Sequence, residues 1–249
     1  MQLEIEPSLS AKYLGLRASI LSVTGVTVRK STLALDELKK FVIDEVKSKY
    51  SLDTLKDVSI FRAYRDFFWR AGIDPTKVRP AAEALIRRIL ADKPIPTINT
   101  LVDAYNLASI KTGIALAAFD QARLRGTLLM RSAKPDEEFF GIGMNKPMRL
   151  NGGEIVVSDN EKLIAVYPYR DADSSKVTEE TKGLVLMVCG CPGIDEVSLQ
   201  QAEQVATDLI VRFCGGTWVN NEVQKPVRDL ALKSSAHSKV SLHLVPLCQ

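Results

Sequence analysis

The residues from 99 to 106 place three polar side chains at helical spacing. Asn99 stands directly before an apolar run, where an asparagine caps a helix by accepting bonds from backbone N–H groups. Asp103 and Asn106 follow three residues apart, so they share one face of that helix. Two polar groups on one face can serve a binding site, although they are usually solvated. Their spacing alone does not decide between these roles.

Residues 61–70 interleave aromatic and arginine side chains. Aromatic rings stack on bases and guanidinium groups bind phosphates, so this segment could be a nucleic-acid surface. Helical spacing also places several rings on one face, which is typical of a helix buried in the core. We favour this buried helix, whose apolar face would consist of Phe61, Tyr64, Phe68 and Trp69. A further hypothesis is that Phe67, Phe68 and Trp69 are exposed and bind another protein.

Arginines also flank the next predicted helix. Arg79 precedes a helix start, where anions bind well, and with Arg87 and Arg88 it could hold a phosphate. Glu83 and Arg87 stand four residues apart and are expected to pair on the surface. The segment is therefore either a phosphate site or a solvated charged face.

The sequence predicts no metal site and no cofactor. The four cysteines are Cys189, Cys191, Cys214 and Cys248, and the two histidines, His237 and His243, stand near the C-terminus. A metal site would need more ligands in one place, so we expect free, buried thiols in a reducing compartment. The run from Gly141 to Gly143 lacks the third glycine and the βαβ context of a dinucleotide-binding turn.

Composition excludes several functional classes. The net charge is only +3 over 249 residues, so DNA binding is not expected, and any nucleic-acid contact must come from local clusters of charge. The N-terminus has neither the basic nor the apolar region of a signal peptide, and no apolar stretch is long enough to span a membrane. We therefore predict a cytoplasmic protein without membrane contact. Nothing in the sequence specifies an oligomeric state.

The hydrophobic periodicity changes along the chain. It predicts short strands within residues 1–30, helices over roughly 31–46, 58–70, 79–90 and 100–111, strands at 127–131, 154–158, 162–167 and 184–188, and a last helix over 199–213 capped by Ser198. This order predicts an α+β fold, with the N-terminal helices packed on a mixed, largely antiparallel sheet. We predict one domain over residues 1–225 and a tail over 226–249 that is poorly ordered or lies outside the core fold.

Several separate motifs follow one another over roughly residues 60–215. The clearest are Arg79-Pro80, Asn99, Val102-Asp103, Asn106, Phe119-Asp120 and Arg131-Ser132-Ala133, followed by the runs GGEIVVSDN and DSSKVTEETKGLVLMV. In this order the motifs resemble the B3/B4 tRNA-binding domain of the phenylalanyl-tRNA synthetase β subunit. The first 55 residues or so are less diagnostic.

In that family the domain handles tRNA and houses an editing pocket that hydrolyses tRNA carrying the wrong amino acid. The resemblance therefore implies a B3/B4-like fold in a freestanding protein that binds tRNA or aminoacyl-tRNA, with deacylation of mischarged tRNA in trans as the implied reaction. The implied substrate-binding or RNA-binding residues are Arg79, Asn99, Asp103, Asn106, Asp120, Arg131 and Thr178. Ligation is not expected, because the chain has no nucleotide-binding motif and no room for a catalytic module.

One departure from the family pattern bears on catalysis. Bacterial synthetases have a histidine two residues before the Phe-Asp pair, and this chain has Ala117 there, whose methyl group cannot position a water. The acidic residue that usually ends the strand at 184–188 is also absent. Two alternatives stay open. The protein is a deacylase that positions its water differently, or it is a non-catalytic module that binds an amino acid, a small metabolite or RNA in the same pocket.

Overall fold

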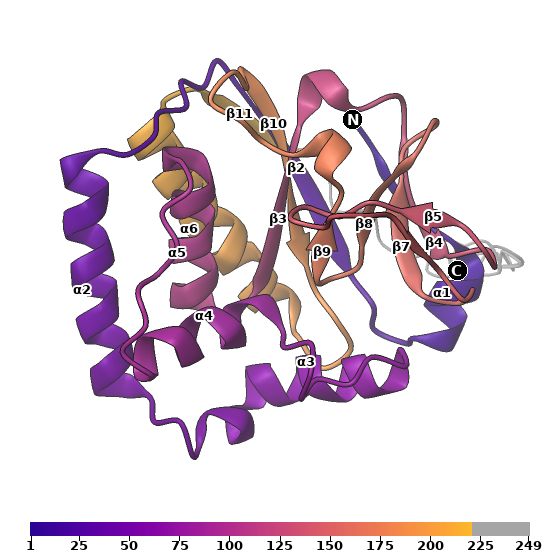
Figure 1. Cartoon of the computed structure of the whole chain (residues 1–249), viewed down its shortest axis with the longest axis horizontal. Coiled ribbons are helices and arrows are strands. Elements are labelled where there is room, and N and C mark those ends of the chain that lie inside the picture. The colour runs from indigo at the N-terminus through magenta and orange to yellow at the C-terminus, as the bar shows by residue number, and fades with distance from the viewer. Residues whose placement is uncertain (221–249) are drawn as a thin grey trace, which may run out of the picture.

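A group of helices lies on one side of a central antiparallel sheet, and a second sheet lies on the other side (Figure 1). The computed structural model describes residues 1–220. The helices beside the central sheet are α2 (Leu33–Lys49), α4 (Ala81–Leu90), α5 (Thr100–Thr112) and α6 (Glu196–Cys214). α3 (Ser59–Arg70) runs below both layers in the view of Figure 1, and α1 (Pro7–Lys12) lies beside the second sheet.

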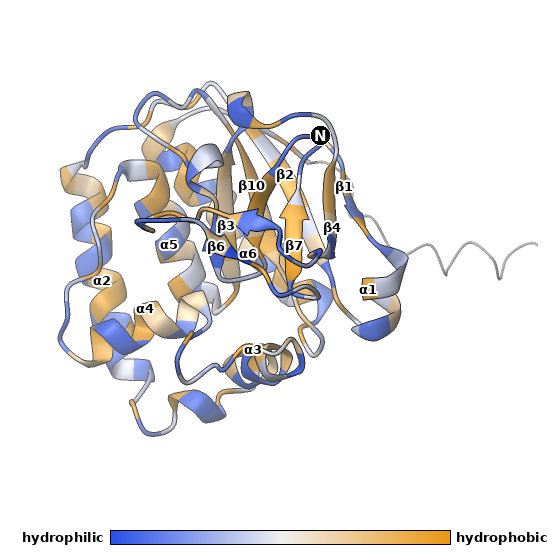
Figure 2. Ribbon diagram, turned by 45° about the vertical axis from the view of Figure 1, so that its right-hand side comes forward, coloured by the Kyte–Doolittle hydropathy of each residue, from blue (hydrophilic) through white to orange (hydrophobic). Residues whose placement is uncertain are grey.

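The central sheet has the strand order β11-β2-β10-β3, and all neighbouring strands are antiparallel. Its strands are β2 (Ala18–Thr24), β3 (Ala115–Asp120), β10 (Gly183–Cys189) and β11 (Thr217–Asn220). Both β3 and β10 are buried along nearly their whole length, because helices cover one face and the second sheet covers the other. Strands covered on both faces are apolar without alternation, and Figure 2 shows this for β10.

The second sheet has the order β1-β4-β7-β8-β9. Its strands are β1 (Leu3–Ile5), β4 (Leu128–Ser132), β7 (Ile155–Ser158), β8 (Leu163–Val166) and β9 (Arg170–Asp171). Only β1 and β4 run parallel to each other; the other neighbouring pairs are antiparallel. A hairpin of β5 (Glu138–Phe139) and β6 (Met148–Arg149) adds a small apolar cluster around Phe139.

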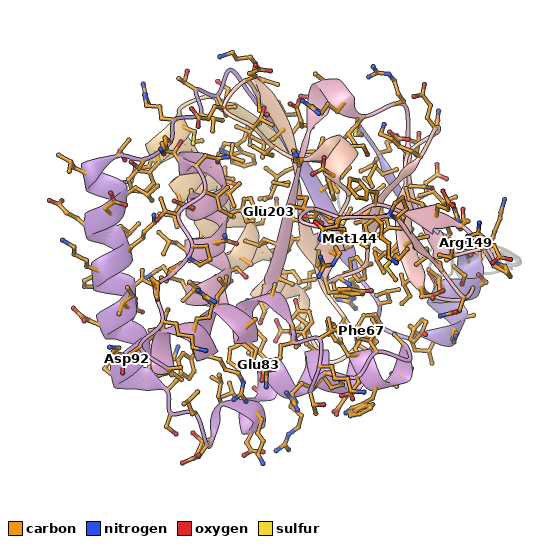
Figure 3. All side chains as sticks on the ribbon, in the orientation of Figure 1. Phe67, Glu83, Asp92, Met144, Arg149 and Glu203 are labelled. Atoms are coloured by element: carbon orange, nitrogen blue, oxygen red, sulfur yellow. The ribbon has the colours of Figure 1, made fainter. Side chains whose placement is uncertain are left out.

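A buried carboxylate joins α3 to α4. Glu83 is fully buried, and its Oε1 lies 3.1 Å from Nη1 of Arg65 and 2.7 Å from Nε of Arg87. The predicted pair of Glu83 and Arg87 is therefore present, but its carboxylate lies in the interior rather than on the surface (Figure 3). A paired carboxylate is the form in which a buried charge is tolerated.

The predicted α+β class with a mixed, largely antiparallel arrangement is confirmed. Several elements differ from prediction. The strands β3, β5, β6, β9 and β11 were not predicted, and helix α1 lies within residues 1–30, where only short strands were expected. In addition, α6 begins at Glu196 rather than at residue 199. Its cap is Asp195, whose carboxylate accepts the Ser198 N–H at 2.7 Å, so Ser198 is not the capping residue.

The aromatic segment is the core helix α3. Phe61, Tyr64 and Phe68 are buried as predicted, whereas Trp69 is 56% exposed, so its predicted place on the buried face was wrong. Phe67 is also buried and points from α3 toward the sheets (Figure 3). The hypothesis of an exposed patch of Phe67, Phe68 and Trp69 is therefore wrong. Four of the five rings of α3 are buried, so α3 is mainly a core helix, and Trp69 is its one exposed ring.

One further prediction falls outside the described residues, and another is examined over residues 1–220 alone. The predicted tail over 226–249 and both histidines lie outside the described residues. Over residues 1–220, no helix combines the length and the apolar composition that crossing a bilayer requires.

Candidate active-site cavity

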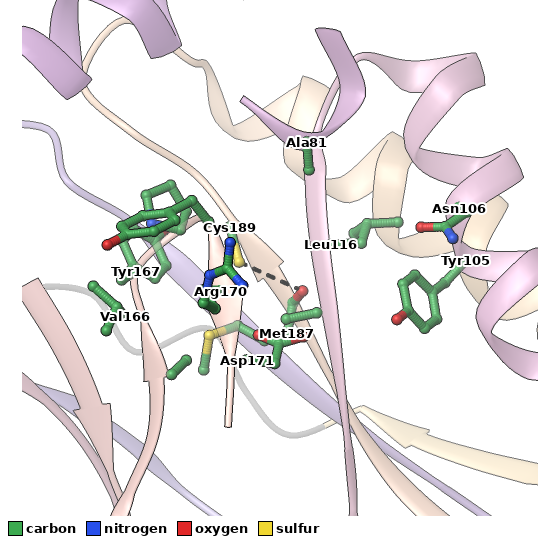
Figure 4. A pocket seen from close by; sticks show the side chains of 14 residues that line it. Ala81, Tyr105, Asn106, Leu116, Val166, Tyr167, Arg170, Asp171, Met187 and Cys189 are labelled. Carbon is green, nitrogen blue, oxygen red and sulfur yellow. Dashed lines mark hydrogen bonds between the residues drawn. The ribbon is translucent and has the colours of Figure 1, made fainter. Parts of the chain in front are cut away.

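A cavity of about 170 Å³ lies between the two sheets and the start of α4 and the middle of α5. β3 and β10 of the central sheet form one wall, and β8 and β9 of the second sheet form another. Figure 4 shows Tyr105 and Asn106 on the α5 side, with Tyr167 and Arg170 across from them. An engineered apolar cavity of about 150 Å³ holds a benzene molecule, so this space fits one amino-acid side chain.

Small side chains open this space. Ala81 at the start of α4, Ala117 on β3 and Ala165 on β8 all line the cavity. The register places Ala117 opposite Met187 and Ala165 opposite Asp171, so each alanine has a cavity-lining neighbour across its strand pair. Position 117 therefore faces the cavity, as the family resemblance implied, and it contributes a methyl group instead of an imidazole.

The turn between β8 and β9 ties the second sheet to the end of β10. Tyr167 precedes Pro168 through a cis peptide bond, and both residues line the cavity. The buried Tyr167 hydroxyl donates a hydrogen bond to the carbonyl oxygen of Gly190. This bond connects the two sheets at one end of the cavity.

Asp171 supplies a carboxylate to the cavity. It is partly buried and follows Arg170 on β9, and its carboxylate makes no hydrogen bond or ion pair with any of residues 1–220. Loss of water around this carboxyl raises its pKa from 3.8 to about 7. A carboxyl group with such a pKa exchanges protons readily near neutral pH.

Tyr105 adds a hydroxyl to the same space. Burial raises the pKa of this phenol above its ordinary value, and the nearby charges of Asp171 and Asp103 raise it further. The hydroxyl therefore stays protonated and is able to donate a hydrogen bond. Asn106, one residue further along α5, lines the cavity with its amide.

Burial raises the pKa of the thiol in the cavity wall. Cys189 is buried, and its pKa is raised well above the ordinary value, first by burial and then by the Asp171 charge. The neighbouring Cys191 has its pKa raised to about 12 by burial. Both remain thiols at neutral pH, whereas thiolates are the reactive form. These two residues and Cys214 are free cysteines, as predicted.

Of the seven residues predicted to bind substrate or RNA, only Asn106 lines the cavity. Asn99 is buried and caps α5, its Oδ1 accepting the N–H groups of Leu101 and Val102 at 3.1 and 2.9 Å. Asp103 is buried as well and pairs with Lys39 of α2. The shared helical face predicted for Asp103 and Asn106 does not bring both side chains to one site.

Asp120, at the end of β3, and Thr178, in the segment before β10, are connected through Thr181. The Asp120 carboxylate accepts the Ala122 N–H at 3.0 Å and the Thr181 hydroxyl at 2.8 Å. Thr181 in turn accepts the backbone N–H of Thr178 at 3.0 Å. These bonds hold the segment before β10 against β3.

The two arginines among the predicted residues have different surroundings. Arg131 on β4 makes a two-pronged pair with Glu137, with distances of 2.8 and 2.7 Å, and this pairing raises the pKa of the guanidinium. Arg79 is exposed and makes no ion pair within residues 1–220. Arg87 and Arg88, proposed to join it on a phosphate, are bonded to Glu83 and to the carbonyl oxygen of Pro94 instead.

Sequence reasoning did not single out Asp171 or Tyr105. Asp171 lies on a two-residue strand, and Tyr105 lies on α5 between the predicted site residues Asp103 and Asn106. The run Tyr-Pro-Tyr-Arg-Asp at 167–171 was the available signal, because it joins aromatic rings, a turn and two charges. Within residues 1–220, no three histidine, cysteine or acidic side chains gather closely enough to hold a metal ion.

The chain is similar in sequence to phenylalanine–tRNA ligase β subunits. The chain is 24% identical over 223 residues to the phenylalanine–tRNA ligase β subunit of Haemophilus ducreyi, covering 80% of this chain and 28% of that protein. It is 27% identical over 271 residues to the corresponding subunit of Fusobacterium nucleatum, covering 99% and 32%. The chain thus spans about a quarter to a third of these relatives. An N-terminal fragment of the phenylalanyl-tRNA synthetase β subunit from Pyrococcus horikoshii aligns over 87% of this chain and 50% of its own, with a TM-score of 0.48 and 12% identity.

The family comparison covers the cavity itself. The model of the B3/4 domain matches residues 63–232, which include most of α3, all of α4 and α5, both walls of the cavity and the turn at 167–171. This match spans more than half of the sequence. The chain belongs to the B3/4 domain family.

Proposed function

We propose that this chain binds the 3′ end of an aminoacyl-tRNA and hydrolyses the ester bond of mischarged tRNA in trans. The observation that carries the proposal is the Asp171 carboxylate, which faces a cavity of amino-acid size without a protein partner. Membership in the B3/4 domain family and similarity to phenylalanine–tRNA ligase β subunits support tRNA as the partner. Those ligases are about three times as long as this chain, so ligation is not part of the proposal.

The size of the cavity limits what enters it. About 170 Å³ accommodates an aminoacyl side chain up to roughly one aromatic ring, but not a nucleotide as well. The ribose and the terminal base therefore remain at the mouth. Tyrosine, alanine and methionine side chains form much of the wall, so apolar or aromatic aminoacyl groups bury the largest area there.

The proposed reaction uses Asp171 as a general base. Its carboxylate takes a proton from a water molecule as the water oxygen attacks the ester carbonyl carbon. The Tyr105 hydroxyl and the Asn106 amide are the available donors to the oxygen that becomes negative. The intermediate then breaks its bond to the ribose oxygen, and Asp171 returns the proton to that oxygen. The products are the free amino acid and an uncharged tRNA.

Deacylation of a panel of mischarged tRNAs by the purified chain tests this proposal. We expect Asp171→Asn to lower the rate by about 10²–10⁴-fold, the usual contribution of a general base. Asp208→Asn is the matched control, because Asp208 is an exposed aspartate on α6, a helix that contributes no residue to the lining of the cavity. No turnover of any aminoacyl-tRNA above the spontaneous rate, or an Asp171→Asn variant as fast as the control, would overturn the proposal.

The second candidate is a module that binds an amino acid, a small metabolite or RNA without hydrolysis. Ala117 favours it, because the residue facing the cavity at this position carries no group that handles a proton. This candidate predicts that free amino acids raise the melting temperature, since a ligand that binds only the folded state stabilises it. Hydrolysis of any aminoacyl ester that depends on Asp171 excludes it. For either function we place the protein in the cytoplasm, which the three free thiols within residues 1–220 support.

A further inference from the structure

Arg170 stands at the mouth of the cavity with its positive charge unpaired. The residue lines the cavity and is exposed, and it makes no ion pair within residues 1–220. Its one hydrogen bond runs from Nη1 to the carbonyl oxygen of Ile142, at 3.3 Å. A guanidinium has five N–H groups, so most of its donors remain free for a ligand.

The stem of Arg170 lies against the backbone of Gly141. A Cβ atom added at Gly141 would lie 2.5 Å from Cδ and 2.8 Å from Cγ of Arg170, so the methylene groups lie directly against the Gly141 backbone. Gly141 itself is bridged to Ala172, which follows β9. A charged head on a fixed stem loses little conformational freedom when it binds an anion.

A second exposed arginine lies close to the cavity along the chain. Arg79 is exposed, makes no ion pair with the described part of the chain, and lies two residues before Ala81, which lines the cavity. Figure 4 shows Ala81 at the top of the cavity and the Arg170 guanidinium directed toward that end. Arg170 thus offers an unpaired guanidinium at the cavity, and Arg79 offers a second exposed one two residues from the lining residue Ala81, while Asp171 contributes a carboxylate to the lining.

We infer that Arg170, together with Arg79, binds the phosphate group that joins the last two nucleotides of the tRNA. The inference rests on the proposed function, in which the aminoacyl group occupies the cavity. One ribose separates the ester from that phosphate, so a phosphate-binding cation belongs at the mouth rather than in the interior. Guanidinium groups recognise phosphate oxygens through paired N–H donors, which a lysine cannot do.

Inhibition by two small probes tests the phosphate site. The dinucleotide CpA contains this phosphate and adenosine does not, and each is added to a deacylation assay with aminoacyl-tRNA. We expect CpA to inhibit the wild-type protein at least about tenfold more strongly than adenosine, because one charged hydrogen-bonded contact contributes about that factor. Equal inhibition by the two probes would overturn the inference.

Variants assign the effect to residues. Arg170→Gln is expected to remove most of the advantage of CpA, and to lower the slope of log affinity against log salt for tRNA by about 0.7, the value for one phosphate contact on a single strand. Arg125→Gln is the control, because Arg125 is also exposed and also donates only to carbonyl oxygens. Gly141→Ala keeps the charge but displaces the stem, so it should reduce the advantage of CpA while the protein stays folded.

These experiments distinguish a failure of the phosphate site from a failure of the proposed hydrolysis. If the wild-type protein deacylates tRNA but Arg170→Gln and Arg125→Gln respond to CpA alike, the phosphate assignment is wrong and the proposed function stands. If the wild-type protein deacylates nothing, direct binding of CpA and adenosine replaces the inhibition assay. If CpA then binds more tightly than adenosine, and Arg170→Gln abolishes this difference, the phosphate site is supported and the proposed hydrolysis is rejected.

Discussion

Lys39 of α2 and Asp103 of α5 form an ion pair of 2.7 Å in which both side chains are nearly inaccessible to solvent. The other oxygen of Asp103 accepts the backbone N–H of Ile98 at 3.0 Å, and Lys39 also donates to the Thr97 hydroxyl at 3.0 Å. Asp103 therefore fixes the segment before α5 against α2. Its carboxylate is occupied by structural contacts on the side of α5 that faces α2.

The first prediction is that Asp103→Asn destabilises the protein without a specific effect on the cavity. The substitution leaves Lys39 buried without its closest counter-charge, which should lower the free energy of unfolding by about 3 kcal/mol. The loss stays at the lower end of the usual range because Lys39 keeps Asp36 at 3.3 Å. Urea denaturation measures it. A kcat/KM that falls while stability is unchanged would show that Asp103 contacts the substrate.

The second prediction concerns Glu83. Glu83→Gln removes the charge that two arginines share between α3 and α4. We expect the free energy of unfolding to fall by about 2–4 kcal/mol, since a buried charge network loses its central partner. Glu37→Gln, on the exposed face of α2, should change it by less than about 0.5 kcal/mol. Equal effects of the two substitutions would contradict the structural role of Glu83.

The third prediction is a dependence of stability on pH. The pKa of Asp171 is raised in the folded state, so the folded protein holds this proton more tightly than the unfolded chain. The wild-type protein should therefore lose stability as the pH rises from about 4 to about 7, and Asp171→Asn should not show this loss. At pH 8 the variant should be more stable by roughly 1–2 kcal/mol, after allowance for partial solvent exposure. Thermal unfolding at pH 4 and pH 8 measures the difference, which should vanish at pH 4.

The fourth prediction concerns the pH dependence of hydrolysis. A general base acts in its deprotonated form, so the rate should rise with pH and level off above about 7, the pKa of Asp171. Single-turnover deacylation, corrected for spontaneous ester hydrolysis, gives the profile. A rate that increases tenfold per pH unit through pH 9 would point to hydroxide attack without a general base.

The fifth prediction concerns the size of the substrate. Ala117→Leu adds three carbons to the wall of the cavity, directly opposite Met187 in the sheet. It should lower the rate for aminoacyl groups with an aromatic ring by much more than the rate for alanyl groups. Only the aromatic group needs the part of the cavity that the leucine side chain would occupy. Comparison of the two substrates on one variant separates this effect from a general loss of folding. A uniform loss for both substrates would indicate that the aminoacyl group binds elsewhere.

The helices were the most predictable part of the fold. α2, α3 and α5 have apolar residues at helical spacing, and Thr32 and Asn99 cap two of them with their side chains. β3 escaped prediction because its sequence, Ala-Leu-Ala-Ala-Phe-Asp, neither alternates nor is rich in β-branched residues. Its strand conformation is imposed by pairing with β10 along six residue pairs. That partner is more than sixty residues away in the chain, so no local signal specifies it.

The site was less predictable than the fold for a related reason. Polar residues before and within α5 attracted attention, but Asn99 and Asp103 satisfy backbone N–H groups and a buried lysine. Asp171 is unremarkable in the sequence, and its environment arises only when β9 folds beside β8 and faces β3 and β10. Desolvation of a carboxyl group is a property of the assembled interior. Spacing along the chain does not reveal it.

The two walls of the cavity belong to sheets that share no strand. Each sheet is hydrogen-bonded within itself, and the separation between them depends on side-chain packing and on bonds such as that from Tyr167 to Gly190. A molecule held between β9 and β10 would therefore act as a bridge, and its arrival should slow amide hydrogen exchange on both sheets together. After it leaves, the two sheets should move apart more easily at the cavity. This motion gives the product a route out.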